Sequence, residues 1–171
     1  AVGPEINIIL DFKSKIILIS GPTASGKSNF AIQLAKKIDG EIINADSMQV
    51  YKQLKILSAR PDPKIYKKIN HHLYGFQDAK KKFSTGDWLK AVTKKISELR
   101  TKNKIPILVG GTGLYFKALT DGLVKIPNIS MKNRNQVRTM HKKLGQKKFF
   151  NKLLKLDPLS LGKINPTDSQ R

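Results

Sequence analysis

The residues Gly21–Ser28 read GPTASGKS and match the phosphate-binding pattern G-x-x-x-x-G-K-[ST]. They lie between an apolar run, KIILIS, and an amphipathic stretch, NFAIQLAKKI, so they connect a predicted strand to a predicted helix. Glycines in such a loop let backbone N–H groups approach phosphate oxygens, while Lys27 supplies a charge and the Ser28 hydroxyl a ligand for Mg²⁺. The predicted phosphate-binding residues are Gly21, Pro22, Thr23, Ala24, Ser25, Gly26, Lys27 and Ser28.

A second candidate for chemistry is Asp46, which directly follows the apolar stretch EIINA. In a doubly wound sheet the carboxyl ends of the strands line the ligand crevice, so Asp46 is predicted to face the phosphate loop. A simpler alternative is that Asp46 or Ser47 caps a short turn, and the two roles are compatible. The apolar run IPILV ends in Gly110 and Gly111, without the acid that a nucleotide-dependent phosphoryl transferase normally uses to hold its metal.

Hydrophobic periodicity predicts the elements that position these residues. Strands alternate with helices, which indicates an α/β fold with a parallel sheet and flanking helices. Trp88 is predicted to lie in the core, and the adjacent His71 and His72 are predicted to be a packed pair rather than metal ligands. The predicted strands are 15–20, 41–45 and 105–111, with an extended segment in 69–76, and the predicted helices are 28–38, 86–100 and 113–120.

The C-terminal part has a different composition. Pro127 marks a predicted boundary between an α/β core, residues 1–126, and a small helical region, residues 127–171. Gly145 separates two predicted basic helices, 131–144 and 146–156. The net charge of the chain is +21, and its concentration in 125–155 favours a nucleic-acid partner over a general compositional bias.

Composition excludes several classes of function. The chain has 171 residues and no cysteine, which rules out disulfides, thiolate catalysis and zinc–thiolate sites. Its apolar runs are shorter than the ~20 residues of a membrane-spanning helix. The N-terminal stretch AVGPEINIILDFK lacks the basic start of a signal peptide, so a cytoplasmic location is predicted.

Six stretches, taken in order, resemble the tRNA dimethylallyltransferases (isopentenyl-tRNA transferases): GPTASGKS, INADSMQVYKQLKILSARP, HHLYGF, STGDWLKA, PILVGGTGLYFKAL and NPTDSQR. The resemblance extends from about Lys15 to Arg171. It implies a P-loop NTPase-like core and transfer of a dimethylallyl group to tRNA. The donor would be dimethylallyl diphosphate, and the acceptor the exocyclic amine of the adenosine 3′ of the anticodon. The loop would then hold a diphosphate with Mg²⁺, rather than a nucleotide.

The resemblance also implies roles for individual residues. Asp46 matches the general base, and Lys27 and Thr23 match residues that act on the diphosphate. The helical region resembles the start of an inserted domain that clasps the anticodon stem of a monomeric enzyme. The residues that match tRNA-contacting positions are Asp46, Ser47, Met48, Gln49, Thr112, Arg134, Gln170 and Arg171.

Members of the family continue beyond the position that corresponds to Arg171, so the chain is expected to be a C-terminally shortened member of low stability. Whether it is active alone is left open by the sequence. Two alternatives remain. One is a P-loop kinase of a nucleoside or small molecule, and the other is a catalytically inactive RNA-binding fragment.

Overall fold

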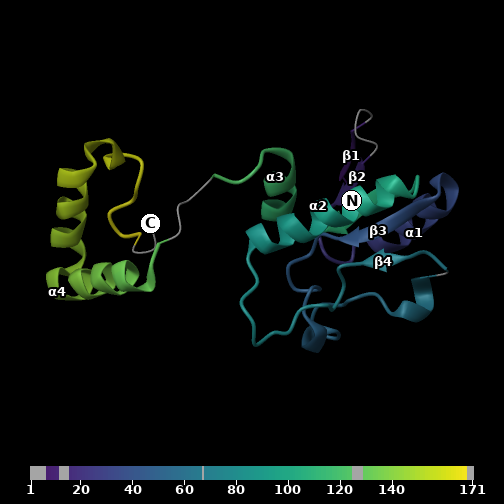
Figure 1. Cartoon of the computed structure of the whole chain (residues 1–171), viewed down its shortest axis with the longest axis horizontal. Coiled ribbons are helices and arrows are strands. Elements are labelled where there is room, and N and C mark those ends of the chain that lie inside the picture. The colour runs from purple at the N-terminus through teal and green to yellow at the C-terminus, as the bar shows by residue number, and fades with distance from the viewer. Residues whose placement is uncertain (1–6, 12–15, 67, 125–128, 169–171) are drawn as a thin grey trace, which may run out of the picture. The chain divides into compact units, whose positions relative to one another are not determined.

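The computed structural model describes residues 7–11, 16–66, 68–124 and 129–168. The chain separates into two compact units, Ala1–Leu123 and Val124–Arg171. Figure 1 draws the first unit from purple to green and the second from green to yellow. Pro127, the predicted boundary residue, lies outside the described residues.

The first unit is built on a sheet whose described part has five strands in the order β1-β2-β5-β3-β4. The pairs β2·β5, β3·β5 and β3·β4 are parallel, as the alternation of strands and helices predicted. The sequence analysis assigned no strand before Lys15, but β1 pairs with β2 in the antiparallel sense at the edge of the sheet. The strands are β1 (Asn7–Asp11), β2 (Ile16–Ser20), β3 (Gly40–Asn44), β4 (His71–His72) and β5 (Ile105–Gly110).

Helices cover both faces of this sheet because side chains alternate along each strand. One face packs against α1 (Lys27–Ile38) through residues such as Ile19, Ile42 and Ile107. The other packs against α2 (Thr85–Thr101) and α3 (Gly113–Thr120), with Trp88 fully buried as predicted. In Figure 1, α2 crosses in front of the strands.

A capping box fixes the start of α2. The Ser84 Oγ accepts a hydrogen bond from the Asp87 amide at 3.2 Å, and Asp87 Oδ2 accepts one from the Ser84 amide at 3.0 Å. Each side chain therefore pairs a backbone N–H that the first turn leaves without a partner. Hydrogen bonds from Ser84 hold the pKa of Asp87 below its ordinary value.

The segment between β3 and α2 contains two short 3-10 helices, η1 (Lys52–Leu54) and η2 (Pro63–Tyr66), and β4. His71 stacks on Tyr66 with ring centroids 3.6 Å apart, and His72 Nε2 lies 2.6 Å from Glu41 Oε2. Burial opposes ionisation of Glu41, but hydrogen bonds from His72 and Asn70 outweigh it and lower the pKa of Glu41. The prediction of a packed histidine pair is confirmed.

The second unit consists of α4 (Met131–Leu156) followed by η3 (Pro158–Ser160). Gly145 has φ 72° and ψ 166°, so it divides α4 into the two helical halves that were predicted. These halves turn sharply against each other (Figure 1). His141 Nε2 lies 2.6 Å from Gln146 Oε1, across the kink. No helix within the described ranges of the chain combines the length and apolarity needed to cross a bilayer.

Candidate functional site: a phosphate loop beside Asp46

The phosphate loop connects β2 to α1. Ala24 and Gly26 adopt left-handed conformations, with φ 62° and 84°. Left-handed residues among right-handed ones turn successive amides toward one side and form a concave anion site. Because α1 begins at Lys27, the positive end of its dipole lies at the same place.

The Lys27 ammonium group lies within this loop. It donates a hydrogen bond to the Pro22 carbonyl and lies 3.4 Å from Ser25 Oγ. Burial lowers the pKa of Lys27, and the Asp46 carboxylate offsets part of that effect. The side chain of Thr23 is exposed at the surface of the loop.

Asp46 lies at the carboxyl edge of the sheet, two residues after β3 ends. Gly111, just after β5, lies between Asp46 and the start of the phosphate loop. A Cβ atom on Gly111 would lie 3.6 Å from the Gly21 carbonyl oxygen and 3.9 Å from Asp46 Oδ2. Asp46 therefore lies beside the loop, where its position after a parallel strand predicted it.

The two carboxylate oxygens of Asp46 have different surroundings. Oδ1 accepts hydrogen bonds from the Met48 amide at 2.8 Å and the Gln49 amide at 3.3 Å. The predicted capping role is therefore confirmed. Oδ2 is the oxygen on the side of Gly111 and the loop, and it is not one of the acceptors used by the cap.

Thr112 contacts the same turn. Its Oγ1 accepts a hydrogen bond from the Ser47 amide at 2.9 Å and lies 3.3 Å from Ser47 Oγ. The Thr112 amide donates to the Ala45 carbonyl at 3.4 Å. The structure thus brings together Thr112 and Asp46–Gln49, which lie far apart in the sequence.

Gly110 sets how closely the ends of β3 and β5 approach. A Cβ atom there would lie 2.1 Å from both the carbonyl carbon and the carbonyl oxygen of Ala45. Backbone atoms cannot move aside as a flexible side chain can, so only glycine fits here. Gly110, which stands where a metal-binding acid would be expected, is therefore required by packing against the backbone next to Asp46.

Two aromatic residues support the site from the side of α2 and α3. Tyr115 stacks on Trp88 with ring centroids 4.1 Å apart, so it packs as the sequence predicted. Burial raises the pKa of Tyr115 to about 12, with smaller contributions from Tyr51 and Asp46. The Tyr115 hydroxyl therefore stays protonated near the carboxylate at neutral pH.

One residue that the sequence analysis did not single out is Asn44. It is fully buried at the end of β3, and its side chain hydrogen-bonds to the backbone of Asp46. The sequence did carry a signal for it, because Asn44 is a polar residue next to the apolar pair Ile42 and Ile43 in a predicted buried strand.

The donor set at the loop suits Mg²⁺. Magnesium at phosphate sites takes one or two protein oxygens and completes its shell with phosphate oxygens and water. Ser28 provides a hydroxyl at the start of α1, beside the phosphate loop. Across the described residues, no three His, Asp or Glu side chains gather into a metal cage, which such a site does not need.

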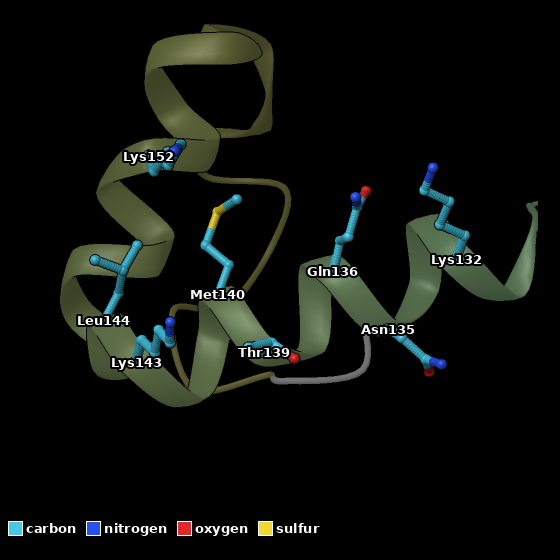
Figure 2. Close-up of a pocket in the computed structure, with 8 residues that line it drawn as sticks. All are labelled: Lys132, Asn135, Gln136, Thr139, Met140, Lys143, Leu144 and Lys152. Carbon is cyan, nitrogen blue, oxygen red and sulfur yellow. The ribbon is translucent and has the colours of Figure 1, made fainter.

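The second unit contains a basic concavity of about 650 Å³ between the halves of α4. Lys132, Gln136 and Met140 project from one face of the first half, and Lys152 comes from the second half (Figure 2). The lining residues are Lys132, Asn135, Gln136, Thr139, Met140, Lys143, Leu144 and Lys152. Arg134 is exposed on α4, and the predicted Gln170 and Arg171 lie outside the described residues.

A strand, phosphate loop and helix, with an acid after another parallel strand of the same sheet, define a P-loop α/β protein. The family model described as IPP transferase matches residues 49–171, and the chain belongs to this family. It is 67% identical over 162 residues to a tRNA dimethylallyltransferase of Pelagibacter ubique, covering 95% of this chain and 52% of that protein. A tRNA dimethylallyltransferase of Rickettsia massiliae is 51% identical over 160 residues, covering 93% and 44%. The chain thus spans about half the length of these relatives.

Solved structures have the same fold. A eukaryotic dimethylallyltransferase acting on tRNA superposes with a TM-score of 0.78 at 31% identity, over 91% of this chain and 39% of that chain. The full-length tRNA isopentenylpyrophosphate transferase of Bacillus halodurans gives a TM-score of 0.63 at 32% identity, over 91% and 52%.

Proposed function

We propose that this chain carries the catalytic portion of a tRNA dimethylallyltransferase. The reaction would transfer a dimethylallyl group from dimethylallyl diphosphate to the exocyclic amine of the adenosine 3′ of the anticodon. The observation that carries the proposal is that Asp46 Oδ2 and the phosphate loop lie on either side of Gly111 in a member of this family.

In this reaction the diphosphate is the leaving group. The allylic C–O bond breaks with its electron pair going to the diphosphate, so negative charge grows on the atoms that the loop would hold. Lys27 and the backbone amides of the loop residues other than Pro22 would stabilise that charge, and Thr23 would add a hydroxyl donor. A bound diphosphate would replace the Pro22 and Ser25 contacts that Lys27 now makes.

Asp46 would accept the proton. The adenine amine is a weak nucleophile because its lone pair is delocalised into the ring, so removing its proton as the new C–N bond forms lowers the barrier. Oδ2 lies on the side of Gly111 and the phosphate loop while Oδ1 is held by backbone amides, which suits a base of fixed orientation. The adenosine would have to leave the stack of the anticodon loop to reach it.

The Ser28 hydroxyl, together with the diphosphate oxygens, would hold Mg²⁺, which would supply further charge neutralisation on the leaving group. Lys27 and the loop amides would orient the same oxygens.

The tRNA would be bound by both units. Ser47, Met48, Gln49 and Thr112 lie in or beside the Asp46 turn, where an extruded base would enter. The lysines of the second unit, with Arg134, would bind the phosphate backbone of the anticodon stem. Gln170 and Arg171 remain predicted tRNA contacts. The monomeric state and the cytoplasmic location also remain predictions.

A prenyl-transfer assay tests the proposal. Labelled dimethylallyl diphosphate and Mg²⁺ are incubated with an anticodon stem-loop that carries adenosine 3′ of the anticodon, using the wild-type chain, Asp46→Asn and Asp121→Asn. Label should enter the RNA with the wild type and Asp121→Asn, and fall ~10²- to 10⁴-fold with Asp46→Asn.

Two other outcomes would support the two alternative functions. RNA binding without transfer by the wild type would support the inactive RNA-binding alternative for this chain. Transfer of phosphate from ATP to a nucleoside would support the kinase alternative.

A further inference from the structure

Asn44 is a polar residue in a place that favours an apolar one. It ends β3, all of whose residues are buried, and its own side chain is fully inaccessible to solvent. A buried amide without partners costs several kcal/mol by rough estimate, so its hydrogen bonds must be accounted for.

The side-chain hydrogen bonds that Asn44 makes with the described residues all go to backbone groups. Oδ1 accepts from the Asp46 amide at 2.9 Å, and Nδ2 donates to the Asp46 carbonyl at 2.9 Å. Nδ2 also donates to the Leu73 carbonyl at 3.1 Å. The Asn44 carbonyl in turn accepts from Trp88 Nε1 at 3.1 Å, which anchors the residue to the core.

The side-chain hydrogen bonds of Asn44 pair backbone groups just beyond the point where the sheet ends. The ladder between β3 and β5 ends at Asn44 and Val109, and the Ala45 amide still reaches the Val109 carbonyl at 2.8 Å. The next residue, Asp46, leaves the ladder, and both of its backbone polar groups are paired by Asn44. Since the backbone of Asp46 is held on both sides, the direction of its Cα–Cβ bond is fixed, and the bonds from the Met48 and Gln49 amides to Oδ1 then orient the carboxylate.

We infer that Asn44 is a positioning residue for Asp46, and this inference rests on the proposed function. It holds the carboxylate so that Oδ2 meets the adenine amine while Oδ1 stays on its two backbone amides. Asn44 touches no substrate in this account and acts through Asp46 alone. A misplacement of about 1 Å at a reacting group can cost ~10²-fold in rate, so loss of this support should be visible in kcat.

The first test is a comparison of Asn44→Ser and Asn44→Ala in the wild-type and Asp46→Asn backgrounds. Val92→Ala is the matched control, since Val92 is fully buried in the apolar cluster that contains Trp88 and contributes no polar atom to the Asp46 turn. After correction for the folded fraction, Asn44→Ser should lower the kcat of transfer ~10-fold or more with an unchanged KM for dimethylallyl diphosphate. Val92→Ala should leave kcat unchanged.

The double variant separates positioning from general damage. If Asn44 acts only through Asp46, then Asn44→Ser should lower the residual rate of Asp46→Asn by less than about twofold. An equal proportional loss in both backgrounds would overturn the inference.

The second test does not depend on activity, so it remains decisive if the wild-type chain transfers no prenyl group and the proposed function fails. Amide hydrogen exchange is measured residue by residue in the wild type and in Asn44→Ala, with Asn44→Ser used if the alanine variant does not fold. In the variant, the protection of the Asp46 amide against exchange should fall ~10-fold or more. The Ile42 amide is the internal control. It donates to the Asn70 carbonyl at 3.0 Å, and its protection should not change. Unchanged protection at Asp46, or an equal loss at both amides, would refute the positioning role.

Discussion

The amide of Ser47 donates a hydrogen bond to the hydroxyl of Thr112 at 2.9 Å, and this bond joins residues 65 positions apart. It ties the turn that carries Asp46 to the start of α3. The partly buried Thr112 hydroxyl therefore has a structural partner in addition to its predicted contact with tRNA.

Replacing Thr112 by valine keeps the shape of the side chain but leaves the Ser47 amide without its acceptor. An unpaired, partly buried donor costs about 1–3 kcal/mol, so Thr112→Val should lower the free energy of unfolding by that amount in urea. Thr112→Ser retains the hydroxyl and should stay within about 1 kcal/mol of the wild type. A valine variant as stable as the wild type would show that the bond contributes nothing.

Lys27 should dominate the affinity for a diphosphate. Hydrogen bonds to charged groups contribute about 1.5–3 kcal/mol, so Lys27→Ala should weaken binding of inorganic diphosphate ~10- to 100-fold in titration calorimetry. Lys36→Ala, on the exposed face of α1, should bind as the wild type does. Equal losses in the two variants would mean that general positive charge, not the loop, attracts the anion.

His71 should make stability fall in mild acid. Burial lowers the pKa of His71 below its ordinary value of 6.5, so the unfolded chain takes up this proton at a higher pH than the folded chain does. Unfolding free energy should therefore decrease as the pH falls through 6.5 and level off below the folded pKa.

His71→Phe keeps a ring against Tyr66 and removes this titration, so its stability should depend less on pH between about 7.5 and 5. Urea unfolding at several pH values measures the difference between the two proteins. Parallel curves for the two proteins would exclude His71 as the source.

The lysines that line the α4 concavity should contribute to RNA binding by neutralising phosphates. Replacing Lys132, Lys143 and Lys152 with glutamine should reduce the salt dependence of stem-loop binding, with the slope of log K against log salt falling by about 0.7–0.9 for each phosphate no longer neutralised. The control replaces Lys36, Lys37 and Lys94, which are exposed on α1 and α2. If both triple variants reduce the slope equally, the concavity has no special role.

The sequence predicted those features that depend on neighbours along the chain. The phosphate loop, the position of Asp46 after a strand and the break at Gly145 all follow from local patterns, and all three lie where they were predicted. Long-range pairing was harder to predict. Nothing near β1 shows that it would join β2 in the antiparallel sense. The contacts of Asn44 with Leu73 and Trp88 arise only when distant segments meet.

The two carboxylate oxygens of Asp46 have different roles, and this difference has a consequence for large-scale mutagenesis. Asn keeps an oxygen that can accept from Met48 and Gln49, whereas Ala removes the acceptor altogether. A scan that scores cellular abundance should therefore tolerate Asp46→Asn and reject Asp46→Ala, while a scan that scores prenylated RNA should reject both. Screening for abundance alone would mistake this residue for part of the scaffold.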